Sequence, residues 1–212
     1  MFERPRALRP APPETRRRRL ARWAAAPTRP FGRTLQAIGR LDQRALVALR
    51  TNGHSELGDR IVGGLGDFGE MGSGWAALGL TGAVASPGRR RPFLAAAAVA
   101  PLAVLANYAV KLTIGRERPL VEDHPPLARA PSKLSFPSAH STSSVAGAVA
   151  LGRVAPSARP ALYSLAAAVC IGRPYLGMHY PSDVLAGAAL GYAIGRLAPL
   201  PHVAAEGSEV PA

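Results

Sequence analysis

Two short clusters that each contain a histidine carry the side chains best suited to chemistry in this 212-residue sequence. In the later cluster, Arg173 is followed after five residues by His179 and after three more by Asp183. Pro181 suits the first position of a helix, so Asp183 falls in the first turn, where the helix dipole favours a carboxylate. A carboxylate bonded to one imidazole nitrogen leaves the other nitrogen free to attack. We therefore expect His179 to act as an oriented nucleophile or base.

The earlier cluster, residues 135–144, has the composition of a helix N-terminus. Pro137 and Ser138 suit the entry to a first turn, and the unpaired N–H groups of such a turn favour an anion such as phosphate. His140 would stand in that turn and face the same anion as a proton donor. The alternative is an ordinary serine cap followed by a histidine at a membrane interface.

Basic residues that precede both clusters could add positive charge to the same anion site. Lys111 ends an otherwise uncharged stretch, and Arg118 follows it by seven residues. Pro119 biases Arg118 out of a helix and toward an extended exit. We expect the two cations to converge, although a snorkelling lysine and a solvated loop arginine would give the same pattern.

A metal centre formed by His140, His179 and Asp183 is a competing interpretation. The cations nearby would repel a divalent ion, so we expect no metal and no other cofactor. The single cysteine, Cys170, excludes an internal disulfide and a multi-cysteine zinc site, and we assign it to packing.

Together these residues resemble the three-part signature of the type 2 phosphatidate phosphatase superfamily. That superfamily includes bacterial lipid phosphatases, acid phosphatases and vanadium haloperoxidases. The three motifs here are Lys111-x6-Arg118-Pro119, Pro137-Ser138-Ala139-His140 and Arg173-x5-His179-x3-Asp183. The resemblance covers about residues 70–200. Within it, Ala139 stands where the family usually has glycine, and Gly172 where it often has serine.

The resemblance implies a role for each motif residue. His179 would be the nucleophile that forms a phosphohistidine, Asp183 its orienting partner, and His140 the acid that protonates the leaving alkoxide. The remaining motif residues would hold the phosphoryl oxygens: Lys111, Arg118, Ser138, Ala139 and Arg173. Phosphoryl transfer depends on positioning and on positive charge around the oxygens, so these roles agree with the residue types.

The motifs lie at the ends of apolar segments that are suited to crossing a membrane. A span needs about 20 apolar residues, with a range near 17 to 25. We expect five spans, at residues 71–88, 92–110, 134–152, 160–172 and 184–200. An alternating path through five spans brings the three motifs to one face. The predicted fold class is therefore an all-α integral membrane helical bundle, and a soluble bundle of buried alanine-rich helices is the alternative.

Positive charge is concentrated before these segments. The formal net charge is +13, and residues 1–30 are rich in proline and arginine, which predicts a disordered tail. No aromatic residues interleave with the arginine run, so we expect anionic lipid headgroups rather than nucleic acid as its partner.

Residues 31–70 have apolar side chains at helical spacing and predict amphipathic interfacial helices. Residues 71–200 form the predicted catalytic membrane domain, and 201–212 a flexible tail. In the last span, the repeat of Gly187, Gly191 and Gly195 predicts a smooth ridge for helix packing.

We therefore expect a multi-pass cell-membrane phosphatase that hydrolyses a lipid-linked phosphate or diphosphate monoester. Polyprenyl phosphates or diphosphates, phosphatidate, phosphatidylglycerophosphate and a polyprenyl phosphoribose phosphate all fit. The positive charges of the short noncatalytic loops predict an extracytoplasmic catalytic face, whereas the basic tail favours the opposite. The alternatives are a vanadate-dependent haloperoxidase-like enzyme and a noncatalytic membrane protein that binds anionic lipid. We leave the oligomeric state open, with a homo-oligomer as one alternative, and interpret His54, His124 and His202 as loop residues.

Overall fold

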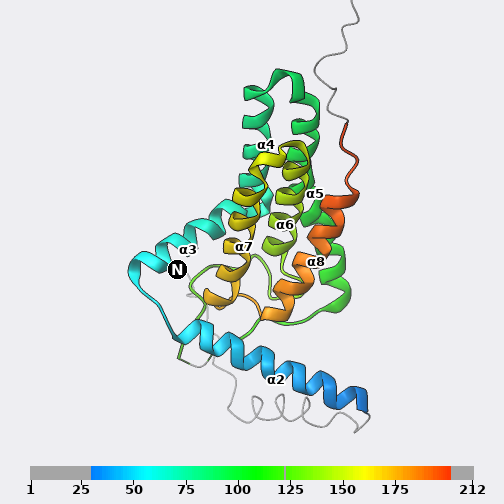
Figure 1. Ribbon diagram of the computed structural model, residues 1–212. Helices are drawn as coiled ribbons and strands as arrows, with labels where there is room; N and C mark the ends of the chain where they lie inside the picture. Colours follow the sequence, from blue (N-terminus) through cyan, green and yellow to red (C-terminus); the bar gives the residue numbers. More distant parts are fainter. Residues whose placement is uncertain (1–29, 122, 202–212) are drawn as a thin grey trace, which may run out of the picture. The chain divides into compact units, whose positions relative to one another are not determined.

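The computed structural model describes residues 30–121 and 123–201, and their secondary structure is helical (Figure 1). The first helix among the described residues, α2, runs from Pro30 to Thr51, and residues up to Leu41 belong to a separate unit from those that begin at Asp42. The later elements are α3 (Glu56–Gly69), η1 (Glu70–Gly72), α4 (Ser73–Ala85), η2 (Pro87–Arg89), α5 (Arg90–Ile114), α6 (Ala139–Val154), η3 (Pro156–Ala158), α7 (Arg159–Tyr175) and α8 (Pro181–Leu197). The all-α prediction is confirmed. The two predicted tails lie outside the described residues, except for Pro30 and Pro201 at their edges.

The helix ends that flank the motifs follow from local chemistry. The Ser138 hydroxyl caps α6 by accepting a hydrogen bond from the backbone N–H of Ser141 at 3.4 Å. α8 begins at Pro181, as the sequence predicts. α5 ends where Gly115 adopts a left-handed conformation with φ 67°, and its N–H donates to the carbonyl of Lys111. The predicted span at 134–152 starts too early, because its first residues belong to the loop that precedes the Ser138 cap.

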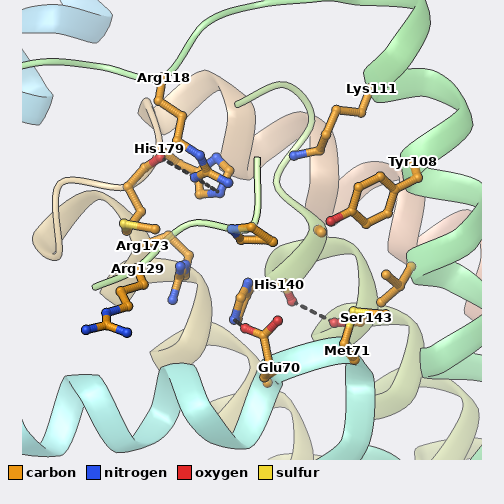
Figure 2. Close-up of a pocket in the computed structure, with 15 residues that line it drawn as sticks. Glu70, Met71, Tyr108, Lys111, Arg118, Arg129, His140, Ser143, Arg173 and His179 are labelled. Carbon is orange, nitrogen blue, oxygen red and sulfur yellow. Dashed lines mark hydrogen bonds and ion pairs between the residues drawn. The ribbon is translucent and has the colours of Figure 1, made fainter. Parts of the chain in front are cut away.

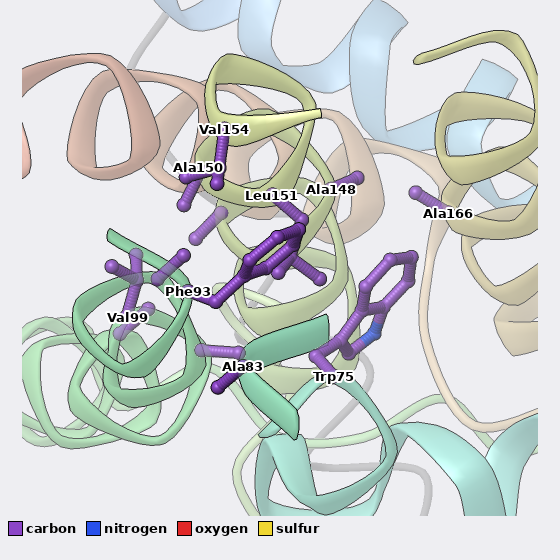
Figure 3. Packing of buried hydrophobic residues seen from close by; sticks show 13 residues of the cluster. Trp75, Ala83, Phe93, Val99, Ala148, Ala150, Leu151, Val154 and Ala166 are labelled. Carbon is purple, nitrogen blue, oxygen red and sulfur yellow. The ribbon is translucent and has the colours of Figure 1, made fainter. Parts of the chain in front are cut away.

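Helix α6 is the centre of the packing. It contacts α5, α7 and α8, and Figure 1 shows these helices side by side. Small residues cover much of its surface, so its neighbours approach closely, while Trp75, Phe93 and Leu151 are the largest members of the buried cluster around it (Figure 3). The polar residues of its first turns are also buried and hydrogen-bonded; for example, the Trp75 indole N–H donates to Ser144 Oγ at 3.0 Å. Cys170 is buried, in agreement with a packing role.

The glycine ridge of α8 packs against α6, as predicted. A Cβ atom added at Gly187 would lie 2.5 Å from the carbonyl oxygen of Ser138, and one at Gly195 would lie 2.7 Å from that of Ala146. At Gly191 the added atom would collide with the Thr142 carbonyl oxygen. The backbones of the two helices therefore meet along the ridge, and this contact sets the distance between the starts of α6 and α8.

One of the described helical segments, Pro87–Ile114, is long and apolar enough to cross a membrane. Helices α4, α6, α7 and α8 occupy the other four predicted spans, but they have 13 to 17 residues each. At 1.5 Å per residue they are shorter than the roughly 30 Å of bilayer hydrocarbon. The predicted count of five spans is thus supported for one helix and stays a prediction for the other four.

The helices alternate in direction, as the sequence predicts. The C-terminal ends of α5 and α7 and the N-terminal ends of α6 and α8 carry the three motifs. Lys111 and Arg173 lie near the two C-terminal ends, and His140 and Asp183 lie in the two first turns. This alternation brings residues that are far apart in the sequence to one end of the helices.

Candidate active site

A single cavity collects most of the predicted site residues (Figure 2). Six of the eight line it: Lys111, Arg118, Ala139, His140, Arg173 and His179. Glu70, Tyr108 and Arg129 line it as well, although the sequence did not single them out. Ser138 and Asp183 are fully buried beside it and do not line it. The cavity therefore brings together three cations and two imidazoles, as expected if the three motifs form one site.

His179 lies in the loop between α7 and α8 with only 1% of its surface exposed. Its Nε2 atom is 3.1 Å from Nη1 of Arg118. A guanidinium can only donate, so Nε2 accepts and the ring proton of the neutral imidazole lies on Nδ1. Burial first, and then the positive charges of Arg118, Arg173 and Lys111, hold the pKa of His179 well below its usual value. At neutral pH the ring is uncharged, and its Nε2 lone pair can attack a phosphorus atom once the Arg118 guanidinium releases it.

Asp183 lies behind the nucleophile, but the expected hydrogen bond is not formed. Its Oδ2 is 3.6 Å from Nδ1 of His179, too far for a hydrogen bond, and Nδ1 has no hydrogen-bond partner among the described residues. Oδ2 instead accepts from the backbone N–H of Tyr180 at 2.9 Å, and Oδ1 is 2.8 Å from Nη1 of Arg116. The carboxylate thus faces the imidazole while other groups hold both of its oxygens.

His140 has a carboxylate of its own nearby. Its Nε2 is 3.1 Å from the carbonyl oxygen of Gly66 and 3.3 Å from Oε2 of Glu70. A carbonyl only accepts, so this nitrogen carries a hydrogen, and Nδ1 is the nitrogen left to exchange a proton with a ligand. The Glu70 carboxylate and the Gly66 carbonyl therefore both lie within reach of the Nε2 hydrogen of His140. Figure 2 shows Glu70 reaching toward His140 from the start of η1, directly after α3.

Of the three motif cations, Lys111 and Arg173 are buried and Arg118 is half-buried, and few carbonyl groups hold them. Lys111 Nζ donates to the carbonyl of Leu134 at 3.2 Å. Arg118 donates through Nη1 to the carbonyl of Met178 at 2.8 Å and through Nε to that of Ser132 at 2.8 Å. Arg173 is 3% exposed, and its Nε has no hydrogen-bond partner among the described residues. Buried donors are normally paired, so an unpaired guanidinium N–H in a cationic cavity indicates a site for an anion.

The start of α6 differs in one respect from the expectation. Ser138 Oγ accepts from the backbone N–H and the hydroxyl of Ser141, and this hydroxyl serves as a helix cap outside the cavity lining. Ala139 does line the cavity, so the N-terminal end of α6 reaches it. The contribution of Ser138 to phosphate binding stays a prediction.

His54 lies in the loop between α2 and α3, as predicted, and it also makes specific contacts. Its Nδ1 is 2.8 Å from Oδ1 of Asp59, and its ring stacks on Tyr175 with a centroid distance of 4.0 Å. The Tyr175 hydroxyl donates to the same Asp59 oxygen at 2.6 Å. These contacts join the start of α3 to the end of α7, next to Arg173. In the sequence, Asp59 is visible only as a polar residue of an amphipathic helix. That pattern does not reveal its partner on α7.

Comparison with known proteins gives a consistent match. A family model described as the PAP2 superfamily matches residues 92–204. A protein of Mycobacterium tuberculosis named decaprenylphosphoryl-5-phosphoribose phosphatase is 41% identical over 162 residues, which cover 73% of this chain and 89% of that protein. The protein of the same name from Mycolicibacterium smegmatis is 45% identical over 126 residues, or 58% of this chain and 67% of that protein.

Two crystal structures have a similar fold. A transmembrane PAP2-type phosphatidylglycerolphosphate phosphatase from Bacillus subtilis has a TM-score of 0.63 at 24% identity, and the match covers 88% of this chain and 93% of that chain. LpxE of Aquifex aeolicus has a TM-score of 0.56 at 23% identity, with 74% and 94% covered. At these identities the two structures support the shared fold alone.

Proposed function

This chain belongs to the PAP2 superfamily, and from that membership and the cavity we propose that it is a membrane-embedded phosphatase that hydrolyses a lipid-linked phosphate monoester through a phosphohistidine. The observation that carries the proposal is the convergence of Lys111, Arg118 and Arg173 with His140 and His179 around one cavity. Fixed cations can balance the charge of a phosphoryl group without a metal ion.

The reaction follows from the two imidazoles. Nε2 of His179 attacks phosphorus, the P–O bond to the alcohol breaks, and His140 gives the departing alkoxide a proton. Water then attacks the phosphohistidine, His140 takes up a proton from that water, and cleavage of the P–N bond releases inorganic phosphate. Asp183 stabilises the positive charge that the His179 ring gains when it bonds phosphorus. Before this step a substrate phosphate has to replace Nε2 as the partner of the Arg118 guanidinium.

We propose that the substrate is a polyprenylphosphoryl phosphoribose, the class named in the relatives from the two mycobacterial species. Two cavity residues outside the motifs support this choice. The Glu70 carboxylate, next to the acid His140, can accept hydrogen bonds from the hydroxyl groups of a sugar. Arg129 adds a fourth cation, and such a substrate has a second phosphate, which links the sugar to the lipid.

The loop that carries Arg129 is anchored on both sides. The backbone N–H of Leu127 donates to the carbonyl of Leu176 at 3.0 Å, and the carbonyl of Ser132 accepts from Arg118 at 2.8 Å. In Figure 2, Arg129 lies at the edge of the group, on the side of Arg173 and away from Lys111. A cation at this edge could bind the phosphodiester that links the sugar to the lipid, while the phosphate to be hydrolysed lies deeper in the cavity.

We also propose that the enzyme is a multi-pass protein with five spans and an extracytoplasmic catalytic face. The similarity of its fold to membrane phosphatases supports a membrane location. At the opposite end of the helices lie several arginines, among them Arg153 and Arg159, and arginines in short loops favour the cytoplasmic side. A reporter fused to the C-terminus tests the orientation, because this topology leaves that terminus in the cytoplasm.

The direct test of the proposed function is phosphate release by the purified full chain in detergent. The substrates are a polyprenylphosphoryl-5-phosphoribose, phosphatidate, phosphatidylglycerophosphate, a polyprenyl phosphate and a polyprenyl diphosphate. We expect the highest kcat/KM for the phosphoribose lipid and inhibition by vanadate. The absence of phosphate release from all five would refute the phosphatase assignment, and activation of halide oxidation by vanadate would favour the haloperoxidase alternative.

The part assigned to Arg129 has its own control. Arg129→Gln should raise KM for the phosphoribose lipid and leave kcat/KM for a short phosphomonoester without a second phosphate unchanged. Lys133→Gln is the matched control, because Lys133 is an exposed basic residue on the same loop that does not line the cavity. Equal effects of Arg129→Gln on the two substrates would remove Arg129 from the recognition of a second phosphate.

A further inference from the structure

Arg116, which belongs to none of the three motifs, reaches the carboxylate behind the nucleophile. It lies two residues before Arg118, in an extended segment where Glu117 forms an antiparallel bridge with Leu134. Alternate residues of an extended chain point to the same side. The two arginines therefore reach toward the same part of the fold, where Arg118 contacts His179 and Arg116 contacts a carboxylate four residues further along.

The Arg116 guanidinium joins two buried carboxylates. Its Nη1 is 2.8 Å from Oδ1 of Asp183, and its Nη2 is 2.7 Å from Oδ2 of Asp42. The side chains of Asp183 and Asp42 are 0% and 4% exposed, so both charges have lost most of their contact with water. The Tyr180 ring lies 4.0 Å from the guanidinium carbon, which restricts the group to one plane. A planar fork with donors on two sides suits this bridging position, and a lysine could not reproduce it.

Asp42 is itself held toward Arg116. Its Oδ1 accepts from the backbone N–H of Ser182 at 2.8 Å, and its Oδ2 accepts from the Ser182 hydroxyl. Nη1 of Arg116 donates to the same hydroxyl at 2.7 Å. These bonds fix Asp42 and Arg116 against the first turn of α8, one residue before Asp183.

This arrangement determines how Asp183 presents itself to the nucleophile. Arg116 holds Oδ1, and the backbone N–H of Tyr180 holds Oδ2, the oxygen that lies 3.6 Å from Nδ1 of His179. With both oxygens held, the carboxylate cannot rotate away from the imidazole. If Arg116 were absent, two buried carboxylates would share one site without a cation, and one would take up a proton or move away. Either change would weaken the stabilisation of a positively charged His179 ring.

We propose that Arg116 is a positioning residue for the phosphatase reaction and that Asp42 keeps it in place, so that Asp183 stays ionised and faces His179. This inference rests on the proposed function, because it concerns the same reaction. It gives a role to a residue on α2 that is separated from Arg116 by 74 positions in the sequence.

The test uses the full-length protein in detergent and measures kcat, KM and the pH profile of kcat for Arg116→Gln, Arg116→Lys and Asp42→Asn. Arg116→Gln should lower kcat by about 10- to 100-fold, the range found for the loss of an outer partner that orients a metal-bound histidine through a carboxylate or similar group. KM should change little, because the three phosphate-binding cations are intact. The acid limb of the pH profile should move to higher pH, since Asp183 then accepts a proton more readily. Asp42→Asn should change kcat and the pH profile in the same direction but less, and Arg116→Lys should recover part of the loss.

Arg60→Gln is the matched control, because Arg60 forms an exposed pair with Glu56 at 3.5 Å and should have no effect. A wild-type pH profile in all three variants, with or without a lower kcat, would overturn the inference, because a purely structural link leaves the ionisation of Asp183 unchanged. If Arg116→Gln does not fold, Arg116→Lys and Asp42→Asn carry the same test. Failure of the wild-type protein to release phosphate would instead refute the proposed function, so the two failures are distinguishable.

Discussion

The contact between α6 and α8 permits a prediction that links packing to catalysis. Gly191→Ala adds one methyl group at the point where the two helix backbones meet. Its carbon would collide with the Thr142 carbonyl oxygen and lie 3.0 Å from the Thr142 carbonyl carbon and 3.1 Å from the backbone nitrogen of Ala146. These atoms belong to the backbone of α6 and cannot turn away as a flexible side chain would. We therefore expect the added methyl group to push α8 away from α6.

The size of the effect follows from measured costs of overpacking. Extra methyl or methylene groups in a filled core cost about 1–3 kcal/mol of the free energy of unfolding. For a protein of this length, about 2–4 °C of Tm corresponds to 1 kcal/mol, so Tm should fall by about 2–12 °C. α8 also carries Asp183, two helical turns before Gly191, and a displacement near 1 Å can lower a rate by about 10²-fold. Activity should therefore fall at temperatures where the variant is still folded.

Gly64→Ala is the matched control for this experiment. Gly64 also lies within a helix, α3, but a Cβ atom there would meet nothing within 4 Å. This change should leave Tm unchanged or raise it slightly, because alanine has a higher helix propensity than glycine. The assay is thermal unfolding in detergent together with phosphate release below the transition. A Tm for Gly191→Ala equal to that of Gly64→Ala would show that α6 and α8 are not in tight backbone contact at Gly191.

Three further predictions concern the cavity. The pKa of His179 lies well below its usual value in the folded protein, so below about pH 6.5 the unfolded chain binds a proton that the folded chain does not. Stability should therefore fall as the pH decreases through that range, by at most about 1.4 kcal/mol per pH unit from this group, and His179→Gln should reduce that slope in unfolding curves. Lys111→Ala should lower kcat/KM by about 10²- to 10³-fold, as expected for the loss of one group that stabilises the transition state, and a steady-state assay that found no loss would exclude Lys111 from phosphate binding. Prolonged dialysis against a chelator should leave phosphate release unchanged, because fixed cations balance the charge, and recovery of lost activity by an added divalent ion would contradict this prediction.

Much of the site could be predicted because local residue types determine it. Proline at the start of α8 and serine at the start of α6 mark helix N-termini that the structure contains. The alternation of apolar segments then brings the first turns that contain His140 and Asp183 to the same end of the helices. The contact of α8 with another helix could be predicted in the same way, because glycines at four-residue spacing allow a neighbouring helix to approach closely.

The contacts made by polar side chains across long sequence distances could not be predicted. Asp42 and Glu70 follow the pattern of the polar face of an amphipathic helix, and that pattern is the same whether the carboxylate meets water, a guanidinium or an imidazole. Arg116 reaches partners that are 67 and 74 positions away in the sequence. Its contacts depend on the path of the loop after Gly115, which neither periodicity nor composition specifies.

The most direct test of the proposed phosphohistidine mechanism is the identification of the phosphorylated residue. Enzyme mixed briefly with ³²P-labelled substrate and quenched in alkali, in which phosphohistidine survives, should carry label on one peptide, and fragmentation should assign it to His179. His140→Ala should still become labelled when the leaving group is a good one, because it lacks the acid and retains the nucleophile. Label on a different residue, or a His179→Ala protein that turns over substrate at the normal rate, would contradict the proposed mechanism.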